Sequence, residues 1–289
     1  MSIDKWLLLS PLVKEDECSS YRQISPVFEY ASESEQCIGC ALMRIQIASD
    51  LHLEFDDGSN AQRLDLVDRD LLVLAGDISV GRGAFAFISE QLRISEVVYV
   101  PGNHEYYGGY RRKQLDAWWR EVAAHELRGL HYLPLDETEI SGIRIRGATW
   151  YSDFWGGDGR FAQIGVSDFR PPFNRPDNWS VQDHKSAHEV ATSWLQLGEN
   201  ADVVVTHFPP TLNAIAKHFR DPTNPASLLN SYFINDREDL VRELNPKVWI
   251  SGHTHVPYDF MVGDCRCVAN PCGYPGESDR FESAKIVEI

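Results

Sequence analysis

The sequence predicts an α/β fold in which parallel and antiparallel strands pair in mixed sheets. Apolar stretches of strand length alternate along the chain with stretches whose apolar residues recur at helical spacing. Five of the apolar stretches end directly in Asp, Asn or His. Hairpin signals, in which a Gly-containing turn adjoins strand-like residues, occur around Gly142 and Gly263. Alternating strands and helices indicate parallel pairing, and the hairpins add antiparallel strands.

The composition is that of one globular domain with an excess of acidic residues. The chain has 289 residues, of which 43% are hydrophobic and 24% charged, enough for one sizeable core. Its formal net charge of −16 argues against a broad nucleic-acid-binding face, which needs clustered Lys and Arg. No apolar run is long enough to span a bilayer, and the run at 6–9 is too short for a secretory signal. We therefore expect a cytoplasmic protein that does not bind membranes.

Residues 1–42 differ from the rest of the chain. They mix Ser, Glu, Pro and isolated apolar residues without a clean period. The strand-like run that begins at Met43 has the form of a domain's natural start. We therefore expect 1–42 to be a non-catalytic N-terminal extension and 43–289 to be the catalytic domain. A peripheral segment packed on the domain is the alternative for 1–42.

The five polar-ended stretches are the expected strands that position a site. They span 45–49, 71–75, 96–100, 203–206 and 248–251. The polar residues that follow them are Asp50, His52, Asp77, Asn103, His104, His207, His253 and His255. Catalytic groups in α/β folds collect at the carboxyl ends of strands, so these residues should form one cluster. Residues two apart, such as Asp50 and His52, point to one side of an extended chain.

Four helices and further strands complete the expected fold. Helical spacing predicts helices over 82–92, 111–127, 181–197 and 236–244. Further strands are expected at 143–150, 259–262, 265–269 and 285–289. Two long stretches, 151–180 and 208–233, lack periodicity, and the aromatic residues of the first favour an ordered lid over disorder.

Two further groups of residues have the spacing of metal ligands. His184 and His188 lie four residues apart on the predicted helix 181–197, but no strand end brings them to the cluster, so we expect them on a solvated helix face. Four cysteines have the spacing of a zinc site: Cys37, Cys40, Cys265 and Cys267. Scattered reduced thiols are the expectation for a cytosolic protein.

The polar residues of the cluster fall into five short motifs. In chain order these are Asp50-Leu51-His52, Gly76-Asp77, Gly102-Asn103-His104-Glu105, His207 alone and Gly252-His253-Thr254-His255. The set resembles the calcineurin-like metallophosphoesterase superfamily, whose pattern is D-x-H, G-D, G-N-H-[DE], H and G-H-x-H. The resemblance covers about residues 43–289. It implies a four-layer αββα sandwich of two mixed β-sheets, with the metal site at the C-terminal ends of the strands.

The resemblance implies a centre of two divalent or trivalent metal ions. Asp50, His52 and His255 would bind the first ion, Asn103, His207 and His253 the second, and Asp77 would bridge them. Mixed oxygen and nitrogen donors suit manganese, iron or zinc, and we expect manganese to serve in vitro. Two ions would activate a metal-bridging hydroxide to attack the phosphate. His104 would act as general acid or charge stabiliser, with Asp50 orienting its ring.

Departures from two branches of the superfamily narrow the expected function. The G-D-x-V-D-R-G pattern of protein Ser/Thr phosphatases is absent, and Val80 stands where purple acid phosphatases have a tyrosine ligand. We expect a metal-dependent phosphoric ester hydrolase acting on a phosphomonoester or phosphodiester bond of a small molecule, with nucleotides among the candidates. A metal-dependent nuclease and a non-catalytic scaffold of the same fold are the alternatives. The acidic charge counts against the first, and the intact ligand set counts against the second.

Contacts to the substrate are expected from Asn103 and from the two irregular stretches, which border strand ends. Their basic residues are the candidates for binding a second anionic group: Arg160, Arg170, Arg175, Lys217 and Arg220. Solvated surface charge is the alternative for each. The expected partner is a small phosphorylated substrate, with no stable nucleic-acid binding, and the sequence leaves the oligomeric state open.

Overall fold

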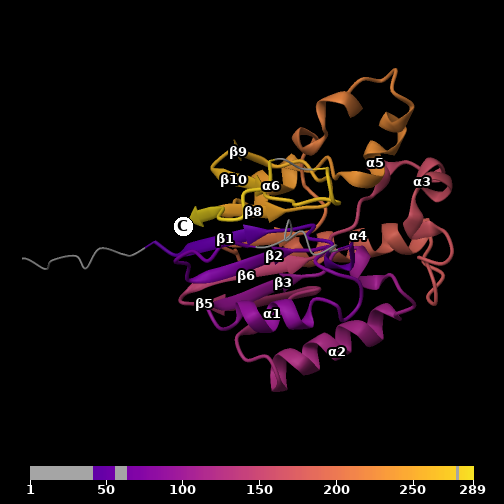
Figure 1. The fold of residues 1–289 in the computed structure, drawn as a ribbon. Helices are drawn as coiled ribbons and strands as arrows, with labels where there is room; N and C mark the ends of the chain where they lie inside the picture. The colour runs from indigo at the N-terminus through magenta and orange to yellow at the C-terminus, as the bar shows by residue number, and fades with distance from the viewer. Residues whose placement is uncertain (1–41, 56–63, 278–279) are drawn as a thin grey trace, which may run out of the picture. The chain divides into compact units, whose positions relative to one another are not determined.

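The computed structural model describes residues 42–55, 64–277 and 280–289 of the chain. Within these residues, two mixed β-sheets lie face to face and helices cover both outer faces (Figure 1). The predicted four-layer αββα sandwich is therefore confirmed. The extension predicted over 1–42 lies, apart from Leu42, outside the described residues, and its non-catalytic role stays a prediction.

The first sheet has five strands in the order β11-β1-β2-β3-β4. These strands are β1 (Arg44–Ala48), β2 (Leu71–Ala75), β3 (Glu96–Val100), β4 (Leu130–Tyr132) and β11 (Ile286–Glu288). The first four run parallel, and β11 pairs antiparallel with β1. β2 is a continuous run of buried apolar residues because the sheet is covered on both faces.

The second sheet has six strands in the order β5-β6-β7-β8-β10-β9. These strands are β5 (Leu135–Ile140), β6 (Ile143–Ala148), β7 (Val203–Thr206), β8 (Val248–Ser251), β9 (Tyr258–Val262) and β10 (Cys265–Ala269). The inner four are parallel, whereas β5 and β9 form antiparallel hairpins with β6 and β10. The hairpin turns predicted at Gly142 and Gly263 are confirmed.

Alternate residues of each strand pack on opposite sides of its sheet. Val73 of the first sheet and Val205 of the second lie in the central core between the sheets. On the outer face of the first sheet, Tyr99 packs edge-on against Trp119, with ring centroids 5.3 Å apart. On the outer face of the second, Trp249 lies in a separate apolar cluster with helical residues. Because successive side chains point to opposite faces of a strand, the two sheets form three apolar cores, one between them and one on each outer face.

Helices cover the two outer faces as the sequence predicted. They are α1 (Phe85–Gln91) and α2 (Arg112–His125) on the first sheet, and α4 (Val181–Leu197) and α6 (Glu238–Leu244) on the second. The helix predicted from residue 82 begins at Phe85, because 82–84 form a turn. The sequence did not predict β4, which has three residues, or the charged β5. No helix within the described ranges is long and apolar enough to cross a membrane.

The two irregular stretches consist of loops with short helices. They include α3 (Arg160–Gly165) in the first stretch and α5 (Asn230–Phe233) in the second, each with 3₁₀ turns nearby. Tyr151 and Phe154 of the first stretch share one apolar cluster with Phe208 and Tyr232 of the second. Residues 151–180 thus form ordered structure around a shared apolar cluster, whereas their role as a lid stays a prediction.

The prediction of a solvated face for His184 and His188 is wrong. Their exposed fractions are 0% and 4%. The ring of His184 lies 4.7 Å from that of Tyr151 and 5.4 Å from that of Tyr232. Helical periodicity identifies the residues that share a face, but the apolar cluster of the irregular stretches covers this face of α4.

Candidate metal centre

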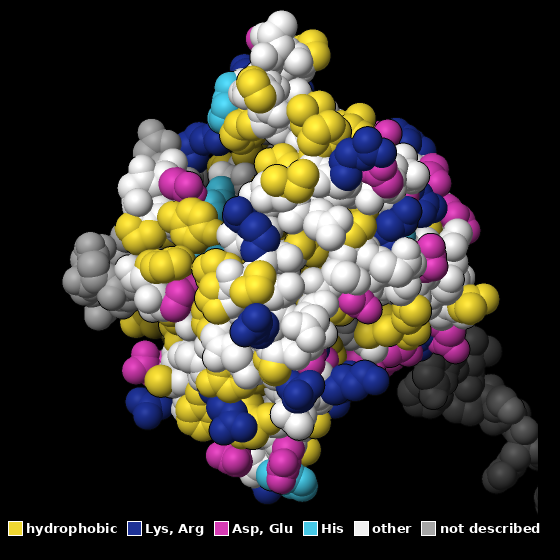
Figure 2. Space-filling model, turned by 90° about the vertical axis from the view of Figure 1, so that its right-hand side faces the viewer, with side chains coloured by type: hydrophobic (Ala, Val, Ile, Leu, Met, Phe, Trp, Pro, Cys, Tyr) yellow, Lys and Arg dark blue, Asp and Glu magenta, His cyan; other side chains and the backbone are white. Residues whose placement is uncertain are grey.

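The carboxyl ends of five parallel strands lie at one edge of the sandwich, on the right in Figure 1. β1, β2 and β3 belong to the first sheet, and β7 and β8 to the second. The segments that follow these strands carry all seven predicted metal ligands. Figure 2 shows this side of the molecule, where hydrophobic side chains lie among scattered basic and acidic ones.

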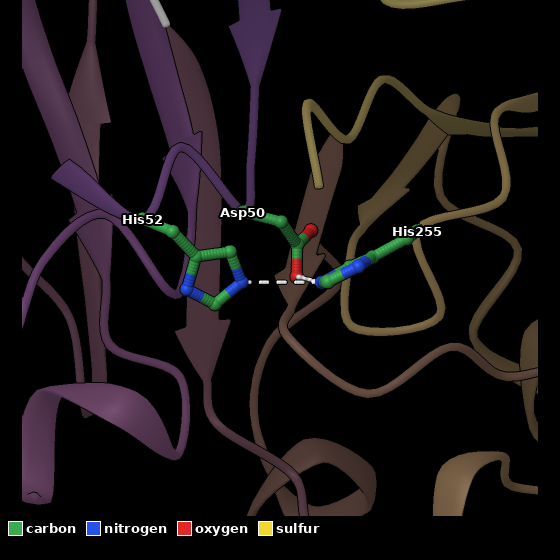
Figure 3. Close-up of side chains that lie close together, drawn as sticks. All are labelled: Asp50, His52 and His255. Atoms are coloured by element: carbon green, nitrogen blue, oxygen red, sulfur yellow. Dashed lines mark hydrogen bonds and ion pairs between the residues drawn. The ribbon is translucent and has the colours of Figure 1, made fainter. Parts of the chain in front are cut away.

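Asp50, His52 and His255 form a first group of converging side chains (Figure 3). Nε2 of His52 lies 3.1 Å from Nε2 of His255, which lies 3.5 Å from Oδ1 of Asp50. The opposite side of each ring faces a carboxylate. Nδ1 of His52 is 3.2 Å from Glu54, and Nδ1 of His255 is 2.6 Å from Glu277. Both imidazoles therefore direct Nε2 toward the space beside Asp50.

Asp77, His207 and His253 form a second group, and Asn103 lies beside it. Nε2 of His207 lies 3.3 Å from Oδ2 of Asp77, and 3.2 Å from both Oδ1 of Asn103 and Nδ1 of His253. Nδ1 of His207 donates to the carbonyl of Ala75 at 2.8 Å. A neutral ring with its proton on Nδ1 has a lone pair on Nε2, so four electron-pair donors meet at this point.

The electrostatics of the second group favour a bound cation. Burial raises the pKa of Asp77, but the His207 and His104 rings outweigh this effect and hold the pKa well below its usual value. Burial lowers the pKa of His207, but the Asp77 carboxylate outweighs that and raises the pKa to about 10. A buried, ionised carboxylate that holds a proton on a neighbouring ring this strongly would also stabilise a metal cation at that position.

The donor atoms of the cluster fit a metal centre. In neutral rings, the carboxylates at Nδ1 leave lone pairs on Nε2 of His52 and His255, and two lone pairs 3.1 Å apart need a proton or a cation between them. Nε2 of His253 is buried and has no hydrogen-bond partner among the described residues. The mixture of imidazole nitrogen and carboxylate oxygen suits manganese, iron or zinc.

The backbone at the cluster adopts left-handed conformations. The φ angles are 52° at Asp50, 46° at His52, 54° at Asp77, 72° at His253 and 52° at His255. Such a conformation costs a non-glycine residue about 1–3 kcal/mol and persists where the surrounding structure enforces it, commonly at functional sites. Five strained residues at three strand ends therefore mark the cluster independently of its side chains.

Two motif glycines let the strand-end segments approach one another. Gly76 has a φ of 89°, and a Cβ there would overlap the ring of His207. A Cβ on Gly102 would overlap the carboxylate of Asp77. Glycine at both positions is therefore needed for the short distances within the second group.

His104 lies between the two groups and contacts a carboxylate that the sequence analysis did not identify. Its Nδ1 is 3.1 Å from Oε1 of Glu54, whereas its Nε2 is 3.1 Å from the hydroxyl of Tyr274 and 4.0 Å from Oδ2 of Asp77. Burial lowers the pKa of His104, but the charges of Asp77 and Glu54 outweigh this and keep the pKa above its usual value. Glu54 thus makes the ring-orienting contact to His104 that was expected of Asp50. The carboxylate oxygens of Asp50 accept from the backbone N–H of His253 instead.

Asp168, which lies in the first irregular stretch, contacts Asn103. The sequence did not predict this contact either. It is 1% exposed, and its Oδ1 accepts from the amide nitrogen of Asn103 at 3.0 Å. The hydroxyls of Tyr107 and Tyr232 donate to the same carboxylate. A carboxylate only accepts hydrogen bonds, so it fixes the Asn103 amide with nitrogen outward and oxygen toward His207.

The contacts missed from the sequence lie outside its regular patterns. Asp168, Tyr274 and Glu277 lie in stretches without periodicity, so nothing in the local sequence connects them to the site. Glu54 follows His52 by two residues, and that spacing was an available signal.

The five basic residues proposed for substrate binding are all exposed: Arg160, Arg170, Arg175, Lys217 and Arg220. Three of them contact their own segments. Arg160 pairs with Asp158, Arg170 donates to the carbonyl of Gly165, and Arg220 donates to the carbonyls of Asn213 and Ile215. Their role in substrate binding stays a prediction.

The three described cysteines are buried. Cys265 and Cys267 lie in β10 and Cys272 follows it. Cys37 and Cys40, the other half of the zinc site considered above, lie outside the described residues.

Residues 43–257 match the protein family described as calcineurin-like phosphoesterase. This span contains all five motifs and most of the chain. The chain belongs to this family. The resemblance inferred from the motifs is thereby confirmed, and membership identifies a hydrolase of phosphoric esters in a family that depends on metal ions.

The chain is also similar to a viral protein and to a solved structure. The chain is 25% identical over 275 residues to an uncharacterized protein of Acanthamoeba polyphaga mimivirus, covering 86% of this chain and 97% of the relative. Among solved structures, the phosphopantetheinyl hydrolase of Mycobacterium tuberculosis superposes with a TM-score of 0.58 at 17% identity, covering 86% of this chain and 96% of that one. The structural match shows a shared fold.

Proposed function

We propose that the protein is a dinuclear-metal-dependent phosphoesterase that hydrolyses a phosphomonoester or phosphodiester bond of a small substrate. The observation that carries the proposal is the position of Asp77. Its carboxylate lies within one converging group with His52 and within another with His207 and His253. A single carboxylate that reaches ligands of both predicted ions has the placement that a bridging ligand needs.

The residues of this chain divide into those that would hold the ions and those that hold the ligands. Asp50, His52 and His255 would hold one ion, Asn103, His207 and His253 the other, and Asp77 would be shared. When bound, the two ions would hold the phosphate, neutralise its charge and lower the pKa of a water molecule. Glu54, Glu277 and Asp168 orient a ligand ring or amide toward the cluster.

His104 is proposed to donate a proton to the leaving-group oxygen from Nε2. Glu54 occupies its Nδ1, so only Nε2 is directed toward the edge of the cluster. Its pKa is raised by the neighbouring carboxylates, so the ring keeps its proton at higher pH than an ordinary histidine.

A panel of phosphoesters tests the proposed function. Wild-type protein loaded with Mn²⁺ should hydrolyse at least one small phosphomonoester or phosphodiester, and an Asp77→Asn variant should lose both metal binding and turnover. The panel includes single-stranded DNA, because cleavage of DNA alone would favour the nuclease alternative. A metal-loaded wild type that is inactive on every ester would favour the scaffold alternative.

The role of His104 is tested by comparing leaving groups. His104→Ala should keep both ions and lower kcat by roughly 10²–10⁴ on esters with poor leaving groups. The loss should shrink for a nitrophenyl ester, whose leaving group hardly needs a proton. The exposed His125 provides a matched control, His125→Ala, which should behave as wild type. Loss of metal from His104→Ala would place the ring among the ligands instead.

A further inference from the structure

We propose that Glu54 is a positioning residue that sets the ring orientation of a metal ligand, His52, and of the proton donor, His104, at the same time. This inference deepens the proposed function and rests on it. It assigns to one partly buried carboxylate the coupling between the first metal position and the group that protonates the leaving-group oxygen.

The geometry at Glu54 is that of a shared hydrogen-bond acceptor. Its Oε1 lies 3.2 Å from Nδ1 of His52 and 3.1 Å from Nδ1 of His104. The side chain of Glu54 is 16% exposed, and the side chains of His52 and His104 are 0% and 12% exposed. The two rings meet edge to face with centroids 4.5 Å apart, so they pack against each other.

The backbone holds Glu54 in place. It lies in a 3₁₀ turn (Leu53–Phe55) directly after His52. The N–H of His52 donates to the carbonyl of Asp77 at 3.1 Å, and the N–H of Leu53 donates to the carbonyl of Ile78 at 2.9 Å. The segment after β1 is thus bonded to the segment after β2, which leaves the Glu54 carboxylate between the two imidazoles.

The chemistry of the acceptor determines which nitrogen of each ring carries a proton. An ionised carboxylate can only accept, so the Nδ1 of each ring must be the donor. In the neutral His52 ring, Nε2 then has the lone pair that a metal requires. In His104, Nε2 is left for proton transfer, on the side where the Tyr274 hydroxyl now lies at 3.1 Å.

Glu277 provides a matched comparison within the same centre. It contacts Nδ1 of His255 at 2.6 Å, as Glu54 contacts His52, and no contact joins it to His104 among the described residues. Glu54→Ala and Glu277→Ala should therefore both weaken binding of Mn²⁺, by roughly 10–100-fold, the usual effect of removing an outer partner of a metal ligand. Only Glu54→Ala should also disturb His104.

The first measurement needs no activity. Nitrogen NMR of the histidine rings in metal-free protein, recorded at a pH where both rings are neutral, should show His52 and His104 protonated at Nδ1 in the wild type and in Glu277→Ala. In Glu54→Ala, which has no acceptor, one or both rings should shift to protonation at Nε2. A wild-type His104 protonated at Nε2 overturns the proposal whether or not the variant folds, and so do unchanged rings in a folded Glu54→Ala.

The second measurement compares leaving groups with saturating metal. Glu54→Ala should lower kcat by at least tenfold more for a poor leaving group than for nitrophenolate, whereas Glu277→Ala should affect both esters equally. The same dependence on the leaving group in both variants would mean that Glu54 orients His52 alone, and it would overturn the coupling. A wild type without esterase activity would contradict the proposed function, whereas the NMR comparison would still decide the role of Glu54.

Discussion

Glu105 joins two of the strand-end segments that carry the candidate metal ligands. Each of its carboxylate oxygens accepts two hydrogen bonds, from the backbone N–H of Asp77 and Gly102 and from the N–H of Ile78 and the hydroxyl of Tyr99, at 2.7–3.0 Å. The side chain is fully buried. Glu105 therefore holds the segment after β2 against the segment after β3, and with it the backbone of Asp77, the proposed shared ligand.

Replacing Glu105 with Gln should destabilise the fold. One carboxylate oxygen becomes an NH₂ group that faces N–H donors, which leaves buried donors unsatisfied at a cost of about 2–3 kcal/mol. Urea denaturation of metal-free protein measures the change in the free energy of unfolding. The exposed Glu90 on α1 is the matched control, and Glu90→Gln should stay within about 0.5 kcal/mol of wild type. A Glu105 variant as stable as Glu90→Gln would contradict this account.

At the scale of elements, the first residue of α2 holds the first irregular stretch. The guanidinium of Arg112 lies 3.8 Å from the ring of Trp179 and 4.5 Å from that of Tyr106. It also donates to the hydroxyl of Tyr151 at 2.6 Å, and its backbone N–H donates to Asp177 at 2.8 Å. The stretch that carries Asp168 is thus anchored at both ends by one arginine.

Arg112→Ala should therefore loosen residues 151–180. A desolvated cation–π contact is worth about 2 kcal/mol, equivalent to about 30-fold in the population of the opened stretch. Limited proteolysis should cut this stretch correspondingly faster than in the wild type. Arg111→Ala is the control, because Arg111 is exposed and makes one ion pair at 3.4 Å with Asp177. Equal cleavage rates in the two variants would show that Arg112 does not anchor the stretch.

The buried face of α4 should make stability depend on pH. Burial holds the pKa of His184 well below its usual value, and the N–H of Ser152 donates to its Nε2 at 3.1 Å, so the folded ring is neutral. Below about pH 6.5 the unfolded chain binds a proton at this residue and the folded chain does not. The contribution of His184 to stability should thus be fully present above about pH 6.5. It should fall as the pH decreases, by up to about 1.4 kcal/mol per pH unit.

A His184→Gln variant isolates that contribution. Glutamine retains an acceptor for the Ser152 N–H but has no proton to bind in this range. Urea denaturation of both proteins at several pH values should show a shallower loss of stability in the variant below pH 6.5. Parallel curves for the two proteins would mean that His184 titrates normally in the folded state.

At the scale of the whole molecule, the candidate metal centre takes its residues from both sheets. Asp50, His52, Asp77 and Asn103 follow strands of the first sheet, and His207, His253 and His255 follow strands of the second. The proposed ions would each take ligands from both sheets. Metal binding should therefore stabilise the sandwich as a unit.

Metal addition should raise the stability of the protein and saturate at two ions per chain. Binding that is confined to the folded state adds about 2.7 kcal/mol at a free metal concentration 100 times Kd for one site. Thermal unfolding with and without Mn²⁺ measures the stabilisation, and elemental analysis of the saturated protein measures the stoichiometry. Saturation at one ion would contradict the dinuclear centre.

The sequence by itself determined the strands that position the site and the residues at their ends. Apolar runs that stop at Asp50, Asp77 or His207 are local signals, and parallel strands bring their carboxyl ends to one edge whatever their order. The helices α2, α4 and α6 were predictable because their apolar spacing is also local. The division of the strands between two sheets entered through the motif resemblance and not through periodicity, and the order β11-β1-β2-β3-β4 came only from the structure.

Only the tertiary structure decided which groups support these residues and which faces are covered. Glu54 meets His104 across 50 residues, and Asp168 meets Asn103 across 65, and no spacing rule connects positions so far apart. His184 shows the same limit, because the period of a helix defines its faces but does not show that an aromatic cluster from other segments buries one of them. Local patterns report backbone geometry, whereas burial and hydrogen-bond partners depend on the packing of segments distant in sequence.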